Sequence, residues 1–280
     1  MIKNDEQKND VALSGKITPA DIRNLRTKGA IHELKLSQMP TLTVKLAQAL
    51  PALQSVEQLW LWCDVTRKAM HHVIKTPGLR VLDILAIKGP GRLAAFAEAI
   101  GLEIFRANHY LTEEDLAEVL QAPALTEIGI QGASLSPQLI DMMLAHPHLA
   151  AMDMERTEFN DAMAATLSTS KRIHTLDLGA TKITGAGLEH LSRMTQLKSL
   201  DLWATQVTLT DLDLLTRLPH LEYLSLGNFD HMPGLDATEL IPRLEALASL
   251  KNIWLDGIRF NEQQVARLRA RIARVNVTCV

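Results

Sequence analysis

Residues 173–184 read IHTLDLGATKIT, and residues 197–208 read LKSLDLWATQVT. The two stretches lie 24 residues apart and share the pattern L-x-x-L-x-L-x-x-T-x-[IV]-T, with Ile replacing the first Leu in one copy. A pattern that recurs at a fixed interval of 20 to 50 residues is the signature of a repeat architecture. This pair therefore predicts an array of stacked repeats.

Further copies of the apolar core flank this pair on both sides. They lie at Ile31/Leu34/Leu36, Val56/Leu59/Leu61, Leu79/Leu82/Ile84, Leu102/Phe105/Ala107, Leu125/Ile128/Ile130, Leu149/Met152/Met154, Leu221/Leu224/Leu226, Leu250/Ile253/Leu255 and Ile272/Val275/Val277. From Ile31 onward, successive copies start 25, 23, 23, 23, 24, 24, 24, 24, 29 and 22 residues apart. A chance apolar pattern does not hold register in this way, so repeats are predicted for nearly the whole chain. A degenerate first copy is expected at Val11/Leu13.

The second half of each repeat predicts a helix. In several repeats a residue that favours helix N-termini falls about twelve positions into the copy, at Ser136, Asn160, Thr184, Thr208 and Asn261. Its side-chain oxygen is expected to accept a hydrogen bond from an otherwise unpaired amide of the first helical turn. Thr112 with Asp115, and Thr18 with Asp21, resemble the capping box. Each repeat is therefore predicted to be a short strand, a turn and a helix that packs back onto the strand.

These residues resemble the leucine-rich-repeat family over roughly residues 8–280. The resemblance implies an α/β solenoid, a horseshoe with a concave parallel β-sheet and convex helices. We expect residues 1–10 to be a polar N-terminal tail and residues 11–280 to be a single domain of about eleven repeats including its caps.

The ninth position of the repeat departs from the family. The family usually has Asn or Cys there, bonded to the turn backbone. This chain has Thr157, Thr181 and Thr205 in its best copies, but Ala133, Tyr110 or Ile258 in others. We therefore expect a less regular ladder of turns in the N-terminal half.

The composition excludes several functional classes. The formal charge is −3 and the pI is near 6.4, which argues against a general nucleic-acid binder. Cys63 and Cys279 are too few for a disulfide framework. No apolar run approaches the roughly 18–20 residues that span a bilayer, and the N-terminus does not resemble a signal peptide. We expect a cytoplasmic protein without membrane contact; export as an effector without a cleaved signal stays open.

The outward-facing positions of the repeats predict a binding surface. The third, fifth, seventh and eighth positions are expected to face the concave side, because side chains alternate along a strand. All four tryptophans fall on them, together with a run of carboxylates at the fifth position of three successive repeats. The predicted partner-binding residues are Trp60, Trp62, Arg106, Asp153, Glu155, Asp177, Asp201, Trp203, Tyr223, Trp254 and Asp256, and Lys35 adds basic charge near the N-terminal end.

Two interpretations of these residues stay open at this point. Tryptophan, tyrosine and arginine dominate binding hot spots, and a column of like charges is repulsive in a folded monomer. Both facts favour a patch for a partner with basic and apolar groups. Alternatively, the carboxylates are simply solvated, and the tryptophans cover neighbouring strand surface.

Motifs that suggest chemistry are interpreted as structural. Cys63 next to Asp64 lacks a histidine fixed nearby by sequence. The pairs His71/His72 and His146/His148 lack the helical i,i+4 spacing of a zinc-protease helix. Lys88-Gly-Pro-Gly91 lacks the Gly-Lys-Thr ending of a phosphate loop and is expected to be a turn. No catalytic residue, metal or cofactor is therefore predicted.

Two further segments have both a structural and a binding interpretation. The helix that carries Arg267, Arg269, Arg271 and Arg274 is expected to cap the array with a solvated outer face. The one long step between repeats contains Phe229, His231 and Met232, in a loop that is either a surface insertion or part of the binding site.

Together these features predict a protein-binding scaffold that is not an enzyme. It would hold another protein in its concavity, as a bacterial effector or an inhibitor-like protein. A ubiquitin-ligase-type effector is an alternative, although the family places that activity in a separate domain and repeats fill this chain. A structural array that dimerises through its concave face is a second alternative. The sequence does not specify the oligomeric state.

Overall fold

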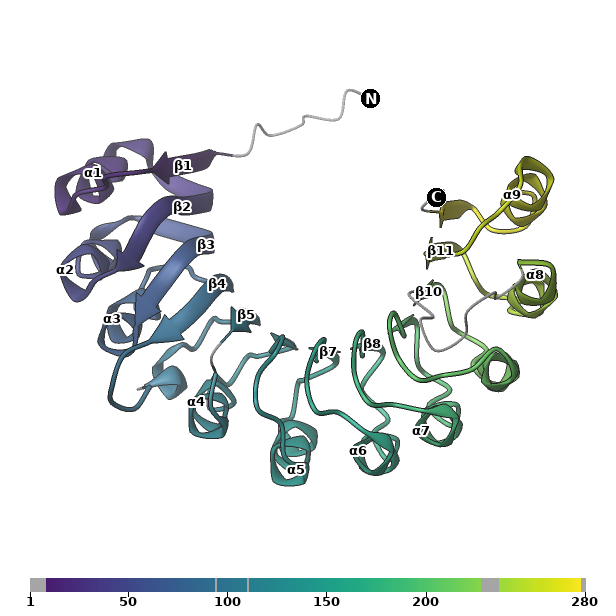
Figure 1. Ribbon diagram of the computed structural model, residues 1–280. Coiled ribbons are helices and arrows are strands. Elements are labelled where there is room, and N and C mark those ends of the chain that lie inside the picture. The colour runs from purple at the N-terminus through teal and green to yellow at the C-terminus, as the bar shows by residue number, and fades with distance from the viewer. Residues whose placement is uncertain (1–8, 94, 110, 228–236, 278–280) are drawn as a thin grey trace, which may run out of the picture. The chain divides into compact units, whose positions relative to one another are not determined.

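The computed structural model describes residues 9–93, 95–109, 111–227 and 237–277 (Figure 1). Three features considered above lie outside the described residues: Tyr110, the segment with Phe229, His231 and Met232, and Cys279. The same holds for residues 1–8 of the predicted N-terminal tail.

Strands and helices alternate along most of the chain. The strands are β1 (Asp10–Ser14), β2 (Ala30–Leu42), β3 (Ser55–Thr66), β4 (Val81–Lys88), β5 (Ile104–His109), β6 (Glu127–Gly129), β7 (Ala151–Asp153), β8 (Thr175–Asp177), β9 (Ser199–Asp201), β10 (Tyr223–Gly227), β11 (Asn252–Asp256) and β12 (Arg274–Val277). The α-helices are α1 (Pro19–Asn24), α2 (Val44–Ala47), α3 (Arg67–Val73), α4 (Glu113–Val119), α5 (Pro137–Ala145), α6 (Asp161–Leu167), α7 (Gly185–Leu191), α8 (Ala237–Glu245) and α9 (Glu262–Arg269). Four 3₁₀ segments complete the set: η1 (Leu25–Lys28), η2 (Leu50–Ala52), η3 (Phe96–Glu98) and η4 (Thr210–Arg217).

The strands of residues 1–133 lie in the sheet in chain order, from β1 to β6, and those of residues 134–280 likewise, from β7 to β12. The chain divides into two compact units, residues 1–133 with β1 to β6 and residues 134–280 with β7 to β12. Within each unit the described pairings are parallel, and the helices lie on one side of the strands (Figure 1). We call the opposite side of each unit's strands its strand face.

The register of the sheet follows the sequence pattern. Val11 and Leu13 pair with Leu34 and Leu36, so the degenerate first copy is confirmed as a strand. In the second unit Leu176 pairs with Leu200, which places each repeat directly beside its neighbour. Equivalent positions of successive repeats therefore form columns across the strands.

The core of each unit is built from the consensus positions. The exposed fraction is zero at Leu34, Leu59, Leu176, Leu200 and Leu224, and the other consensus residues are also buried except at the two ends of the array, where Val11, Leu13 and Val277 are partly exposed. Full burial of a leucine side chain stabilises the fold by about 1.5–3 kcal/mol. A single repeat cannot bury these residues alone, so the stacking of neighbours supplies most of the stability.

Most of the predicted helix caps are confirmed. Ser136, Asn160, Thr184 and Asn261 each accept a hydrogen bond from a backbone amide of the helix that follows. The capping boxes of Thr18 with Asp21 and of Thr112 with Asp115 are complete.

Thr208 was wrongly predicted to be a helix cap. The segment after it is the 3₁₀ segment η4, whose N-cap is Leu209. The amide and the hydroxyl of Thr208 instead donate to the Asp211 carboxylate, at 2.8 and 2.6 Å. Thr18 makes the same two bonds to Asp21 in its capping box. What differs at Thr208 is the backbone: the Asp211 amide donates to the Thr208 carbonyl at 3.1 Å, as in a 3₁₀ turn, and not to the Thr208 hydroxyl.

The turns after β6, β7, β8, β9 and β11 have a left-handed residue at the eighth repeat position, which the sequence pattern did not predict. Arg156, Ala180 and Ala204 have φ values of 58°, 52° and 53°. Gly132 and Gly257 occupy the same position with positive φ. An L-residue in this region costs roughly 1–2 kcal/mol, so the rest of the turn must hold it there.

Two sets of hydrogen bonds hold this turn. The amides of Met154 and Arg156 donate to the carbonyls of Asp177 and Gly179 in the next repeat, at 2.9 and 2.8 Å. The ninth-position Thr hydroxyl donates to the carbonyl three residues before it, at 2.7 Å for Thr181. Thr157 and Thr205 make the same bond, at 2.7 and 2.8 Å. Threonine therefore closes each turn within its own repeat.

The first unit has less regular turns, as predicted. Strands β2 and β3 are 13 and 12 residues long and continue past the turn positions. Their pairings shift register between Ser37 and Thr41, and between Leu61 and Asp64.

Replacing Thr205 with valine tests the role of the ninth position. The side chain is 2 % exposed, and valine keeps its shape but removes the hydroxyl. We expect a loss of about 1 kcal/mol in the free energy of unfolding, because one buried hydrogen bond is lost. Urea unfolding followed by circular dichroism measures it, with the exposed Thr210→Val as the control. An unchanged midpoint for Thr205→Val would remove the hydroxyl from the account of the turn.

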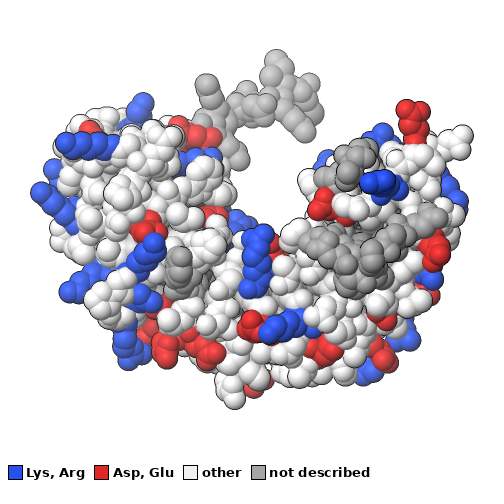
Figure 2. Space-filling model, in the orientation of Figure 1, with Lys and Arg blue, Asp and Glu red and all other residues white. Residues whose placement is uncertain are grey.

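The charged side chains of both units are mixed in sign over the face that Figure 2 shows. Exposed ion pairs between neighbouring repeats contribute to this pattern, among them Arg80 with Glu103 and Arg267 with Glu245. Such pairs are each worth at most about 1 kcal/mol. On the predicted capping helix α9, Leu268 is buried and Arg267 and Arg269 are exposed, which confirms the solvated outer face. The prediction that Arg271 and Arg274 belong to this helix was wrong, because the helix ends at Arg269, Arg271 lies in the turn that follows and Arg274 begins β12.

Candidate functional site

Most of the predicted binding residues lie in the second unit. These are Asp153, Glu155, Asp177, Asp201, Trp203, Tyr223, Trp254 and Asp256, whereas Trp60, Trp62 and Arg106 lie in the first unit. The register places Asp153, Asp177, Asp201, Ser225 and Trp254 in one column across β7 to β11. The fifth-position residues of the second unit therefore form a continuous line.

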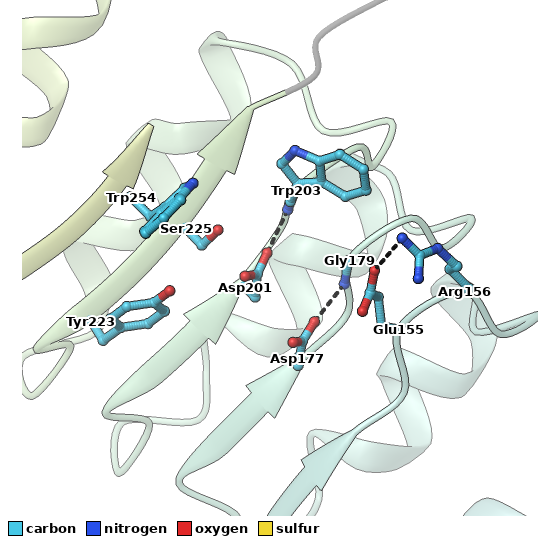
Figure 3. Close-up of a pocket in the computed structure, with 9 residues that line it drawn as sticks. All are labelled: Glu155, Arg156, Asp177, Gly179, Asp201, Trp203, Tyr223, Ser225 and Trp254. Carbon is cyan, nitrogen blue, oxygen red and sulfur yellow. Dashed lines mark hydrogen bonds and ion pairs between the residues drawn. The ribbon is translucent and has the colours of Figure 1, made fainter. Parts of the chain in front are cut away.

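A shallow pocket of about 400 Å³ opens on the strand face of the second unit (Figure 3). Its volume falls within the about 300–1,000 Å³ of ligand sites. We call it the acidic–aromatic pocket; its lining residues are Glu155, Arg156, Asp177, Gly179, Asp201, Trp203, Tyr223, Ser225 and Trp254. Of the eight predicted residues of this unit, six line the pocket. Asp153 stands beside Asp177 in the column, and Asp256 contacts Trp203 from outside the lining.

The carboxylates of the pocket are oriented by their own turns. Asp177 Oδ1 accepts a hydrogen bond from the Gly179 amide at 2.9 Å, and Asp201 Oδ1 accepts one from the Trp203 amide at 2.7 Å (Figure 3). Asp153 makes the same bond to the Glu155 amide at 3.1 Å. Aspartate at the fifth position thus has a structural role in the turn. That role engages one oxygen of the Asp177 carboxylate and one oxygen of the Asp201 carboxylate. An ionised carboxylate can accept about four hydrogen bonds in all.

Burial and mutual repulsion disfavour the charged forms of these carboxylates. Burial, and then the Asp201 charge, raise the pKa of Asp177 from 3.8 to about 7. Burial also raises the pKa of Asp201, against the Trp203 amide and Ser225, which lower it. Burial raises the pKa of Glu155 as well, and the neighbouring Arg156 lowers it. Near neutral pH the pocket therefore holds negative charge that the fold does not fully stabilise.

Three aromatic rings complete the pocket. The Trp203 indole Nε1 donates to Asp256 Oδ2 at 2.9 Å, which fixes the ring across 53 residues of sequence. Trp254 stands on β11 with 44 % of its surface exposed. Tyr223, on β10, is half-buried, and burial raises the pKa of its phenol. Exposure of so large an apolar side chain as Trp254 is unusual, because tryptophan is highly buried on average.

The predicted residues of the first unit form a separate arrangement. Trp60 and Trp62 meet edge to face, with ring centroids 6.3 Å apart, and 54 % of Trp62 is exposed. The Lys35 ammonium lies 5.5 and 5.9 Å from the two ring centroids. Arg106 Nε donates to Glu127 at 2.9 Å. This unit therefore carries a tryptophan pair that already holds a cation.

Three residues of the two arrangements were missed by the sequence prediction. Ser225 and Asp83 occupy fifth positions, and Arg156 occupies an eighth position. Asp83 lies between Trp60 and Arg106 in the register, and Arg106 partly offsets the rise that burial causes in its pKa. The repeat pattern could have identified Ser225 and Asp83, because a fifth-position residue lies in the same column as those of the neighbouring repeats, whatever its type.

Two of the motifs that suggest chemistry in the sequence have structural positions in the described part of the chain. Cys63 is 2 % exposed, and burial raises the pKa of its thiol to about 11, which leaves the reactive thiolate scarce at neutral pH. Residues 88–91 form a turn, with Gly89 and Gly91 at positive φ. Within the described ranges, no group of three or more His, Cys, Asp or Glu side chains is arranged to hold a metal ion.

No family model and no curated protein matches the chain. Among solved structures, an internalin, InlF, from Listeria monocytogenes aligns with a TM-score of 0.54 and 14 % identity over 98 % of this chain and 83 % of that one. TLR13 in complex with a single-stranded RNA aligns with a TM-score of 0.54 and 18 % identity over 96 % of this chain and 39 % of that one. Both are leucine-rich-repeat proteins. The chain has the leucine-rich-repeat fold.

In a leucine-rich-repeat protein the strand face is a surface on which large ligands can lie, but the fold alone does not assign one. None of the helices described is long and apolar enough to cross a membrane. The cytoplasmic location stays a prediction.

Proposed function

We propose that this leucine-rich-repeat chain is a protein-binding scaffold and that its partner contacts the strand face of the second unit. The observation that carries the proposal is the 44 % exposure of Trp254 at the edge of the acidic–aromatic pocket. Tryptophans in such positions dominate the binding energy of protein interfaces. Folding alone gives no reason to leave this ring in water.

The carboxylates of the pocket support the same proposal. Asp177 and Asp201 are partly buried beside one another, which makes their ionised forms unfavourable in the unbound protein. A partner that brings positive charge to this face would remove that penalty on binding. We therefore propose a partner with basic and apolar groups on the contacting surface.

A protein partner suits this surface better than a nucleic acid. The TLR13 structure holds a single-stranded RNA. The phosphates of an RNA would meet Glu155, Asp177 and Asp201 in the pocket, and like charges repel. An exported effector or an inhibitor-like protein is the form of scaffold we propose. A ubiquitin-ligase activity gains no support, because Cys63 is buried.

Replacing Trp254 with alanine tests the proposal. We expect at least a tenfold loss of partner captured from a native lysate of the source organism, because a hot-spot tryptophan contributes about 2 kcal/mol or more. Quantitative mass spectrometry of the captured proteins measures the loss.

The matched control is Met142→Ala. Met142 is an apolar residue of helix α5 in the same unit, 38 % exposed and away from the pocket. Both variants are first checked for an unchanged melting temperature. If Trp254→Ala captures every protein as the unaltered chain does, or if Met142→Ala loses the same proteins, the strand face of the second unit is not the binding surface.

A further inference from the structure

The acidic–aromatic pocket combines two kinds of wall, aromatic rings and carboxylates. Trp203, Tyr223 and Trp254 supply aromatic rings, and Asp177 on β8 and Asp201 on β9 supply carboxylates (Figure 3). Aromatic faces carry negative potential and attract cations. Both kinds of wall therefore favour the same kind of ligand, a positively charged one.

The negative charge of this pocket is only partly neutralised by the residues that line it. Arg156 is the one basic residue among those lining residues, and it pairs with Glu155 at 3.1 Å. Asp177 and Asp201 receive backbone amides, and Ser225 adds a neutral hydrogen bond to Asp201. In the first unit, by contrast, the buried carboxylate at the fifth position, Asp83, stands beside Arg106 in the register.

The first unit also shows what a pair of tryptophans on the strand face can hold. There the Lys35 ammonium lies 5.5 Å from the Trp60 ring centroid and 5.9 Å from that of Trp62. Trp60 and Trp62 occupy the fifth and seventh repeat positions, and Trp254 and Trp203 occupy the same two kinds of position in the second unit. The chain thus contains a cation on two tryptophan rings in one unit, and in the other unit two tryptophans from different repeats that line one pocket with carboxylates.

We propose that the acidic–aromatic pocket binds one guanidinium group, the side chain of an arginine of the partner protein, between the aromatic rings and the carboxylates of Asp177 and Asp201. This inference rests on the proposed function and names the group that the scaffold recognises. Guanidinium is planar, so it stacks on an aromatic ring while its N–H groups donate to carboxylates. Its donors match the carboxylate oxygens that the turns leave available.

An organic cation fits the site better than a metal ion. The acidic side chains within the described residues do not assemble into a metal-binding group. The rings of Trp203 and Trp254 provide stacking surface, which a metal ion does not use. The pocket volume of about 400 Å³ also exceeds what a single ion needs.

Binding of the guanidinium group should depend on pH in a defined direction. The cation favours ionised Asp177, whose pKa is about 7 in the unbound protein. Protonation at lower pH therefore competes with the ligand, and binding releases a proton. If only the ionised form binds, the apparent Kd rises about tenfold from pH 8 to pH 6.

The test uses the full chain with tryptophan indoles labelled with ¹⁵N and N-acetyl-arginine-N-methylamide as the probe. We expect the indole signals of Trp203 and Trp254 to shift on titration, and those of Trp60 and Trp62 to stay in place. The citrulline counterpart has the same shape without the charge and should cause no shift. Equal shifts with arginine and citrulline, or shifts of similar size at all four indoles, would overturn the proposal.

Two aspartate variants and one control test whether the probe that shifts the indole signals binds at the carboxylates. Asp177→Asn and Asp201→Asn keep an oxygen for the turn amide, and each should weaken binding at least about tenfold, the loss expected of a charged hydrogen bond. Glu158→Gln removes an exposed charge in the same unit that pairs with Lys182 outside the pocket, and it should leave the Kd unchanged. Unchanged affinity in both aspartate variants would contradict the proposed contact.

Two further measurements separate the possible outcomes. Free arginine has an α-ammonium and an α-carboxylate that an arginine within a protein lacks, so a pocket for a partner side chain should bind it no more tightly than the blocked probe. Tighter binding of free arginine would assign the pocket to a small molecule and overturn the role of a partner side chain. If Trp254→Ala loses the partner but Asp177→Asn with Asp201→Asn retains it, this inference fails while the proposed scaffold function stands.

Discussion

Replacing Asp177 with asparagine is expected to stabilise the second unit at pH 8 by about 1–3 kcal/mol. The rise of the carboxyl pKa from 3.8 to about 7 means that ionisation is less favourable in the folded chain than in the unfolded one. At about 1.36 kcal/mol for each pKa unit, the penalty has an upper bound of about 4 kcal/mol. Relaxation around the charge reduces this bound to the expected range.

The stability gained by Asp177→Asn should depend on pH, and the direction of the pKa shift decides whether this gain grows or shrinks as the pH rises. A raised pKa in the folded state stabilises the fold fully below the unfolded pKa, near 3.8. That stabilisation is lost as the pH rises through the folded pKa, near 7. The asparagine side chain of the variant does not ionise, so the advantage of the variant should be small near pH 4, grow between pH 4 and pH 7, and stay constant above pH 7.

Urea unfolding of the unaltered chain and the variant at pH 5 and pH 8 measures this effect. Asparagine keeps an oxygen for the Gly179 amide, so the turn should be preserved. Glu158→Gln serves as the control for loss of an exposed carboxylate. If the variant is less stable than the unaltered chain at pH 8, or if its stability changes equally at both pH values, the ionised Asp177 carboxylate is not unfavourable in the folded chain. A stabilised variant that no longer binds the arginine probe would mean that the carboxylate is kept for binding.

Replacing Arg67 with alanine should destabilise the first unit by about 3–5 kcal/mol, the largest effect we expect. Arg67 lies against Asp115, with Nε to Oδ1 at 3.1 Å, and its Nη1 donates to the Gly89 carbonyl at 2.6 Å. The exposed fraction is 12 % for the Arg67 side chain and 3 % for that of Asp115. Truncation would leave a buried carboxylate without its cation, and that state is strongly unfavourable.

Two variants make this expectation specific. In Arg67→Ala/Asp115→Asn the buried charge is also removed, and part of the lost stability should return, because the introduced asparagine can still accept the Thr112 amide of the capping box. Arg92→Ala removes an exposed partner of Glu118 and should change the stability by less than about 1 kcal/mol. Thermal unfolding of all three variants gives the comparison. Equal losses for Arg67→Ala and Arg92→Ala would show that burial does not decide the strength of the pair.

The strands and helices could largely be predicted because the fold is a sum of similar repeats. Leu176, Leu200 and Leu224 recur at a fixed interval, and burial of each in the same environment follows from the stacking of neighbours. Helix starts such as Asn160 and Thr184 were predictable from local hydrogen bonding. Thr208 could not be predicted in this way, because the segment that follows it is a 3₁₀ helix, in which the Asp211 amide donates to the Thr208 carbonyl and not to its side chain.

The candidate site was predictable as a set of positions but not as an arrangement. The alternation along strands identified Asp177, Asp201, Trp203 and Trp254 as residues of one face. It could not show that the Trp203 indole reaches Asp256, because that contact joins different repeats. Arg156 was missed, because the left-handed turn that presents it depends on backbone bonds to the next repeat.

The fifth-position column has a regular spacing, which the proposed partner would meet. Parallel strands lie about 4.8 Å apart, so the carboxyl groups of Asp153, Asp177 and Asp201 recur at about that interval. One turn of an α-helix advances about 5.4 Å, so over two intervals a helix laid across the strands drifts by only about 1.2 Å. Alternate residues of an extended chain lie about 6.8 Å apart, and the same two intervals leave them about 4 Å out of step. The column is thus nearly commensurate with a helical ligand that presents basic residues once per turn.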